Sequence, residues 1–184
     1  MHPSLERLVS LAPMFMLLML AAVIDLRSRR IPNWLSLALA AGGLLHSVLP
    51  GHGVGHGITI VQSMLGLVTG LGLNILLFAA HIRGGGDVKL FAALGAWIGP
   101  MLTIEVFVAS TLVAAVAALI QAGVSGKLSP LLKNTAVLMV SLAHPRELGV
   151  AHVTRPDGSF RSVGRPLPYA VPVMIATLMV LAMN

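Results

Sequence analysis

Residues 8–30, LVSLAPMFMLLMLAAVIDLRSRR, carry the pattern that decides the fold. The run from Leu8 to Ile24 holds no charged side chain, and Asp25 and three arginines follow it. A helix needs about 20 mainly apolar residues to cross a bilayer, so this stretch predicts a membrane-spanning helix with a basic end. The apolar part of a secretory signal is about 7–15 residues long and precedes a cleavage site, so we expect this longer helix to be retained.

The composition of the whole chain agrees with a membrane protein. Of the 184 residues, 57% are hydrophobic and 10% are charged, whereas about 25% of the residues in a soluble domain are charged. The mean hydropathy is +0.92. Cysteine is absent, which excludes disulfides, thiolate metal sites and a cysteine nucleophile within this sequence. The net charge of +6 comes mainly from basic residues beside apolar runs, a distribution typical of membrane orientation signals rather than of nucleic-acid binding.

Further apolar runs predict an all-α, polytopic membrane fold. We expect about six transmembrane helices, at residues 8–26, 33–49, 58–81, 88–99, 101–123 and 167–183. Gly99-Pro100 separates the fourth run from the fifth. Residues 124–166 form an insert that we expect at the cytoplasmic interface, with one amphipathic helix near 128–143 and a turn-rich loop after it. We expect residues 1–184 to form a single membrane-embedded domain.

The distribution of lysine and arginine predicts the orientation in the membrane. Basic residues follow the first, third and fifth predicted helices, and all of them fall on one side if there are six spans with both termini outside. Basic residues gather on the cytoplasmic side of membrane proteins. Asp25 and Asp87 then lie at the same membrane depth, on the cytoplasmic side.

Asp25 and Asp87 are two of only six acidic residues, and both lie at edges of apolar runs. An ionisable group at membrane depth is costly and therefore marks a functional site by default. Two carboxylates held close together seldom ionise at the same time. Such a pair offers one charged group that takes a proton from water and one protonated group that hydrogen-bonds a carbonyl. This is the chemistry of an aspartyl protease, and it requires no metal or organic cofactor.

Each aspartate also has a plainly structural interpretation. Asp25 could pair with Arg27, Arg29 or Arg30, and Asp87 could cap the helix that follows it. The glycines before Asp87 permit unusual backbone angles and close approach, so we expect a turn that offers extended backbone to a substrate.

Polar and small residues in the third predicted helix indicate how it packs. Gly66, Gly70 and Gly72 predict close approach of a neighbouring helix. Gln62 and Asn74 predict hydrogen bonds between helices.

Two motifs resemble one known family. The first runs from Asp25 through the basic residues to Ile31-Pro32-Asn33, as D-x₃-R-x-I-P-N. The second, GGGDVK at 84–89, fits the Gly-x-Gly-Asp pattern of the intramembrane aspartyl proteases. Together they resemble the type IV prepilin peptidases, and LPYAVPVMIA at 167–176 is similar to the final helix of that family. The resemblance covers roughly residues 8–123 and 165–183.

The resemblance implies an activity and its residues. It implies an endopeptidase in the bacterial inner membrane that removes a short basic leader from pilin-like precursors, each a single-helix membrane protein, at the cytoplasmic face. Asp25 and Asp87 would be the catalytic pair. The substrate-binding residues would be Pro32, Asn33, Gly84, Gly85, Gly86 and Lys89. The partners are then the precursor and the lipid bilayer, with no nucleic acid.

The absence of cysteine indicates which branch of this family the sequence resembles. Larger members of the family carry a cytoplasmic loop with paired Cys-x-x-Cys motifs and also N-methylate the new amino terminus. This sequence holds no cysteine, and it resembles the short, peptidase-only branch that serves tight-adherence (Flp-type) pilus systems. We therefore expect cleavage without N-methylation.

A different class of function is also compatible with the two aspartates. Paired carboxylates within a membrane serve proton relays, so a proton-coupled transporter is an alternative, as is a non-catalytic membrane scaffold. Transporters commonly contain inverted repeats, and the two halves of this sequence show no similarity to each other.

Overall fold

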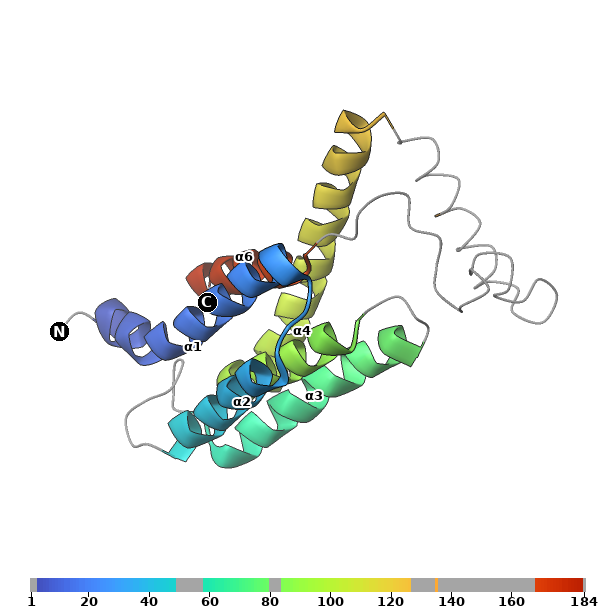
Figure 1. Cartoon of the computed structure of the whole chain (residues 1–184). Coiled ribbons are helices and arrows are strands. Elements are labelled where there is room, and N and C mark those ends of the chain that lie inside the picture. The colour runs from blue at the N-terminus through green and yellow to red at the C-terminus, as the bar shows by residue number, and fades with distance from the viewer. Residues whose placement is uncertain (1–2, 49–57, 80–83, 127–134, 136–167, 184) are drawn as a thin grey trace. The chain divides into compact units, whose positions relative to one another are not determined.

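The computed structural model describes residues 3–48, 58–79, 84–126, 135 and 168–183. The regular elements in these ranges are all α-helices (Figure 1). They are α1 (Pro3–Ser28), α2 (Asn33–Val48), α3 (Ile60–Ala79), α4 (Gly85–Val124) and α6 (Ala170–Met183). The all-α prediction is confirmed, and the ranges predicted as the fourth and fifth spans both fall within α4.

The helices are suited to a membrane. The described stretches that are long and apolar enough to cross a bilayer are Ser10–Ser28, Ile60–Ala79 and Gly85–Val124, and α6 is a shorter apolar helix. Large apolar side chains are exposed on the outside, as at Met16 (72% exposed). Such a surface suits lipid rather than water. The chain is an all-α membrane protein, and the count of six spans stays a prediction.

The chain divides into two compact units. The first consists of Met1–Val113 with Pro168–Asn184, and the second is Ala114–Leu167. Both aspartates and every contact described below lie in the first unit. The amphipathic helix predicted near 128–143 and the loop after it lie outside the described residues. The single-domain organisation therefore stays a prediction.

Helix α4 is interrupted near its middle. Gly99 has φ 75° and ψ 175°, and Pro100 follows it. A positive φ favours glycine, and proline has no N–H with which to continue a helix. The Thr103 hydroxyl donates a hydrogen bond to the Gly99 carbonyl over 2.5 Å, which satisfies an acceptor at the break. The predicted separation at Gly99-Pro100 is confirmed.

Helix α1 buries one stripe of side chains, and this stripe explains the position of Asp25. Leu11, Met14, Leu18 and Ala21 recur at helical spacing and are all buried. Asp25 follows Ala21 by four residues and therefore lies on the same face. In the first unit, α1 packs against both α2 and α6, and α2 packs against α3 (Figure 1).

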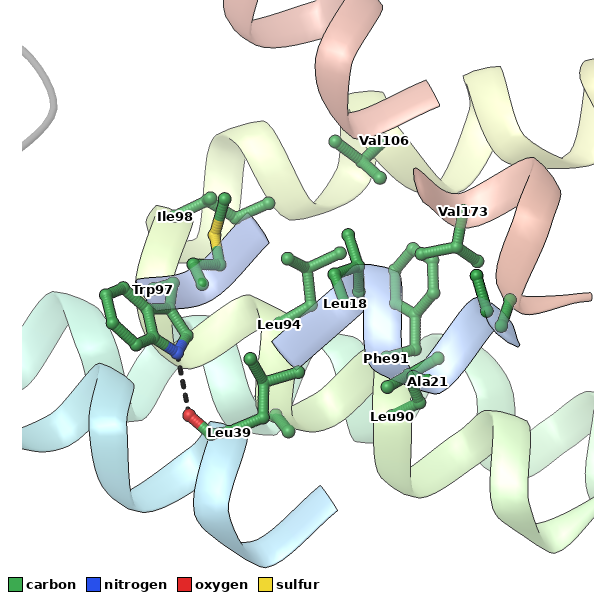
Figure 2. Packing of buried hydrophobic residues seen from close by; sticks show 14 of the residues in the cluster. Leu18, Ala21, Leu39, Leu90, Phe91, Leu94, Trp97, Ile98, Val106 and Val173 are labelled. Atoms are coloured by element: carbon green, nitrogen blue, oxygen red, sulfur yellow. Dashed lines mark hydrogen bonds between the residues drawn. The ribbon is translucent and has the colours of Figure 1, made fainter. Parts of the chain in front are cut away.

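The buried cluster joins side chains from α1, α2, α4 and α6 (Figure 2). At its edge the Trp97 indole N–H donates a hydrogen bond to the Leu39 carbonyl over 2.7 Å, as the dashed line in Figure 2 marks. Gly43 lies directly beneath this indole, since a Cβ there would come within 2.8 Å of the Trp97 ring. The glycine and the hydrogen bond together hold the first part of α4 against α2.

Helix α3 approaches α4 through glycine. Gly66 and Gly95 meet so closely that a Cβ on either would overlap the carbonyl of the other. A Cβ on Gly70 would lie 2.6 Å from the Phe91 carbonyl oxygen. The predicted close approach is confirmed at Gly66 and Gly70. It is wrong for Gly72, because nothing lies within 4 Å of the corresponding Cβ position.

The polar residues of α3 form hydrogen bonds both within this helix and to α4. Gln62 and Thr59 hydrogen-bond each other reciprocally, from the Thr59 N–H to Gln62 Oε1 over 3.1 Å and from the Gln62 N–H to Thr59 Oγ1 over 3.3 Å. This is a capping box at the start of α3, so the predicted interhelical role of Gln62 is wrong. Asn74 is buried and donates to a carbonyl one turn earlier. The Ser63 hydroxyl donates a hydrogen bond from α3 to the Ala96 carbonyl on α4 over 2.5 Å.

Candidate active site

Asp25 is a buried carboxylate held by the start of another helix. Its side chain is 6% exposed, and its Oδ2 accepts a hydrogen bond from the Ala170 N–H over 3.1 Å. Ala170 is the first residue of α6, where N–H groups have no partner within their own helix. The positive end of the helix dipole attracts the negative charge of a carboxylate. Asp25 thus caps α6 from a position 145 residues earlier in the chain.

The end of α1 shapes the backbone around Asp25. The Asp25 carbonyl accepts a hydrogen bond from the Arg29 N–H over 2.9 Å, and Arg29 has φ 53°. This is a left-handed cap that ends the helix. Arg27, Arg29 and Arg30 are exposed. The described partner of the Asp25 side chain is the Ala170 N–H, so the alternative in which an arginine pairs with Asp25 gains no support.

Asp87 lies in the first turn of α4. The Gly84 carbonyl accepts hydrogen bonds from the Asp87 N–H (3.2 Å) and the Val88 N–H (3.4 Å), so Gly84 occupies the capping position. The interpretation of Asp87 as the cap is therefore wrong, since Asp87 is the third residue of the helix. Its side chain is half-buried, and Oδ2 lies 3.6 Å from the point that a Cβ on Gly84 would occupy. A negative charge in the first turn is favourable.

The glycines before Asp87 have ordinary contacts and no positive backbone φ angle. A Cβ on Gly85 would lie 3.5 Å from the Phe78 ring at the end of α3, and a Cβ on Gly86 would lie 3.4 Å from the Ile31 side chain. In the described part of the chain, positive φ angles at glycine occur at Gly99 and Gly126 instead. Gly85 and Gly86 form the first turn of α4, which differs from the expected extended turn. Their N–H groups have no acceptor within the helix, as in any first helical turn.

The two sequence motifs meet in space. The Lys89 ammonium donates a hydrogen bond to the Asn33 side-chain oxygen over 2.9 Å, across 56 positions of sequence. Ile31 packs on Gly86. Pro32 lies between these contacts, and its carbonyl caps α2 by accepting the Leu35 N–H over 3.1 Å. The segment after Asp25 and the segment around Asp87 are therefore held against each other.

Catalysis by Asp25 and Asp87 stays a prediction, as does substrate binding by Pro32, Asn33, Gly84, Gly85, Gly86 and Lys89. The described residues contain no cluster of three histidine, cysteine, aspartate or glutamate side chains that could hold a metal ion.

Sequence reasoning missed the partner of Asp25. Ala170 acts through its backbone N–H, which no side-chain pattern reveals. The available signal was the run LPYAVP, with Pro168 and Pro172 on either side of a helix start. The neighbouring Tyr169 also contributes a contact, because its hydroxyl lies 2.8 Å from Ser110 Oγ on α4.

Comparisons with known proteins agree with these motifs. The prepilin leader peptidase/N-methyltransferase of Aeromonas salmonicida (strain A449) is 38% identical over 96 residues, covering 50% of this chain and 33% of that protein. The protein of the same name in Aeromonas hydrophila is 39% identical over 95 residues, covering 50% and 32%. In Dickeya chrysanthemi it is 35% identical over 85 residues, covering 42% and 28%. The matched part of the chain thus spans about a third of these relatives.

No solved structure matches the chain significantly. The sequence model of the type IV leader peptidase family matches residues 12–119. This range is more than half of the chain and contains both motifs with Asp25 and Asp87. The chain therefore belongs to the type IV leader peptidase family.

Proposed function

We propose that this protein is a membrane aspartyl endopeptidase that removes the basic leader of type IV prepilins, with Asp25 and Asp87 as its catalytic pair. The observation that carries the proposal is the meeting of the two aspartate-bearing motifs. Lys89 bonds to Asn33, and Gly86 packs on Ile31. A transporter or a scaffold does not need these two segments to meet, whereas an aspartyl protease needs both carboxylates at one place.

The chemistry follows from a pair of carboxylates in a site of low polarity. One ionised carboxylate takes a proton from water, and the water oxygen bonds to the carbonyl carbon of the substrate. The other, protonated carboxyl hydrogen-bonds the carbonyl oxygen as negative charge develops there. Return of a proton to the amide nitrogen then breaks the C–N bond. The burial of Asp25 at 6% exposure supports this role, because a buried site strengthens such interactions.

The substrate and the location are further parts of the proposal. The curated relatives are named prepilin leader peptidases, and a pilin-like precursor of the Flp type is the substrate proposed here. The exposed Arg27, Arg29 and Arg30 at the end of α1 support a cytoplasmic position for Asp25. The enzyme would act in the bacterial inner membrane, at its cytoplasmic face.

We also propose cleavage without N-methylation. The support is the absence of cysteine from the sequence, given the paired Cys-x-x-Cys motifs of the methylating members of the family. Incubating the purified protein with a prepilin and a methyl-labelled S-adenosylmethionine tests this point. Mass spectrometry should find a cleaved pilin with an unmodified amino terminus, and a methylated terminus would contradict the proposal.

Leader cleavage in membranes and by purified protein tests the peptidase proposal. Asp25→Asn and Asp87→Asn should each lower the rate by about a thousandfold or more, because each removes an ionisable group while keeping its shape. Asparagine at position 25 keeps an oxygen that can accept the Ala170 N–H, so the fold should survive. Glu105→Gln is the matched control, since Glu105 is exposed on α4, and it should cleave normally. Wild-type rates for both aspartate variants would contradict the proposal and favour a non-catalytic membrane scaffold.

A further inference from the structure

We propose that Tyr169 is a positioning residue for the Asp25 carboxylate. Tyr169 would fix the start of α6, and with it the N–H group that holds Asp25. The inference rests on the proposed function only in treating Asp25 as catalytic. The contacts themselves are properties of the fold, and they can be measured without any substrate.

The covalent geometry connects Tyr169 directly to Asp25. The N–H that bonds Asp25 Oδ2 over 3.1 Å belongs to the peptide group between Tyr169 and Ala170. A peptide group is planar, so the Ala170 N–H turns together with the Tyr169 carbonyl, which accepts the Val173 N–H over 3.2 Å. The Tyr169 side chain supplies a fixed point for this group, through its hydroxyl 2.8 Å from Ser110 Oγ.

The direction of the tyrosine hydrogen bond follows from counting protons. The Ser110 hydroxyl donates to the Phe107 carbonyl over 3.0 Å. A serine hydroxyl has one proton to donate, so its oxygen acts as the acceptor toward Tyr169. Tyr169 is therefore the donor in this pair, and replacing it with phenylalanine removes this hydrogen bond while keeping the ring.

The start of α6 has few N–H groups with which to hold a carboxylate. Pro172 has no N–H, and the Val173 N–H donates to the Tyr169 carbonyl over 3.2 Å. The remaining first-turn donors are those of Ala170 and Val171. The position of Asp25 thus depends closely on where the Ala170 N–H points.

The same contact reaches the helix that carries the second aspartate. Ser110 and Phe107 lie on α4 beyond its break. The Phe107 ring packs edge-on against the Phe91 ring, with centroids 5.8 Å apart. Phe91 lies one turn after Asp87. Tyr169 therefore connects the peptide group that holds Asp25 to α4, which carries Asp87 in its first turn. Its hydroxyl is bonded to Ser110, which favours positioning over direct participation in catalysis.

Hydrogen–deuterium exchange of the full chain in detergent tests the positioning without a substrate. Tyr169→Phe and Ser110→Ala should speed exchange in the segment 168–173 to a similar extent, while the remainder of α6 exchanges as in the wild type. Thr177→Val is the matched control, because the Thr177 hydroxyl bonds only one turn back within α6, to the Val173 carbonyl. Unchanged exchange at 168–173 in Tyr169→Phe would overturn the proposal, and so would acceleration along all of α6, which a purely structural role predicts.

Leader-cleavage kinetics provide the second readout. Tyr169→Phe and Ser110→Ala should each lower kcat by about five- to tenfold, with KM within twofold of the wild type. The double variant should lose no more than either single variant, because all three lack the same bond. Ser110→Thr keeps a hydroxyl and should restore the rate. Additive losses, or a rise in KM at constant kcat, would contradict positioning. If Asp25→Asn abolishes cleavage while Tyr169→Phe does not slow it, only the positioning fails.

Discussion

Lys89 and Asn33 are joined by a hydrogen bond from the lysine ammonium to the asparagine side-chain oxygen, 2.9 Å long and exposed to the surroundings. The bond links the first turn of α2 to the second turn of α4. It lies beside the contact of Ile31 with Gly86. Lys89 and Asn33, the two polar residues predicted from the sequence to bind substrate, are thus bonded to each other in this structure.

Variants of Lys89 and Asn33 distinguish alignment of the two motifs from substrate binding. If the bond aligns the motifs, Lys89→Met and Asn33→Ala should both lower kcat by about five- to tenfold, since a charge-assisted hydrogen bond is lost. Asn33→Asp should keep activity, because a carboxylate oxygen accepts a hydrogen bond from the lysine ammonium equally well. Steady-state cleavage kinetics provide the measurement. A higher KM for Lys89→Met, with Asn33→Ala unaffected, would assign Lys89 to the substrate instead.

Replacing each of the two tryptophans should change the free energy of unfolding by very different amounts. Trp97 is 3% exposed and hydrogen-bonded to Leu39, whereas Trp34 is 58% exposed. Trp97→Phe should lower the free energy of unfolding by about 1–3 kcal/mol, through the lost bond and a small cavity. Trp34→Phe should change it by less than about 0.5 kcal/mol. Thermal unfolding in detergent checks both values, and equal destabilisation would contradict the described burial.

Because each of those variants keeps one tryptophan, fluorescence quenching provides a second check. The Trp34→Phe protein reports Trp97 alone, which a water-soluble quencher should barely reach. Strong quenching there would show that the α2–α4 contact is open.

Glycine substitutions on α3 test how closely it approaches α4. Gly66→Ala should lower the free energy of unfolding by about 1–3 kcal/mol, because its Cβ would collide with the Gly95 backbone. Gly72→Ala on the same helix meets nothing within 4 Å. It should stabilise the helix by about 0.5–1 kcal/mol. Unfolding curves of the two variants should therefore shift in opposite directions, and a shared direction would argue against this helix pairing.

Arg29 has a backbone angle that suits glycine better. Its φ of 53° lies in the left-handed region, which disfavours residues with a Cβ. Arg29→Gly should raise the free energy of unfolding by about 0.5–1 kcal/mol. Arg27→Gly removes the same charge from within α1 and should lower it by about 0.5–1 kcal/mol. Thermal unfolding compares them, and equal effects would show that charge rather than backbone conformation matters at this helix end.

The helices could be predicted because apolar runs and proline-glycine breaks are local signals. The break at Gly99-Pro100 is an example, since both residue types dictate their own backbone angles. The burial of Asp25 could also have been predicted, because its spacing from Leu18 and Ala21 places it on the buried face of α1. Gln62 shows a local signal that was misread: Thr59 stands three residues before it, which is the spacing of a capping box.

The contacts that complete the site are not local. The Ala170 N–H reaches Asp25 across 145 positions, and a backbone donor leaves no trace in residue types. Gly66 and Gly72 look alike in sequence, yet only the face of α3 that meets α4 requires glycine. Which of these glycines faces α4 depends on the register between the two helices. No single residue type in the sequence reveals that register.

The bond between Asp25 and Ala170 has a consequence for biogenesis. Ribosomes add about 5–20 residues per second, so the 145 positions between the two residues correspond to a delay of roughly 7–29 s. During that time α1 exists without α6, and its carboxylate has no helix end to cap. The aspartate acquires this contact only after α6 has been made. A nascent chain would therefore carry Asp25 long before it carries this contact, and the proposed proteolytic activity would arise only after α6 has been made.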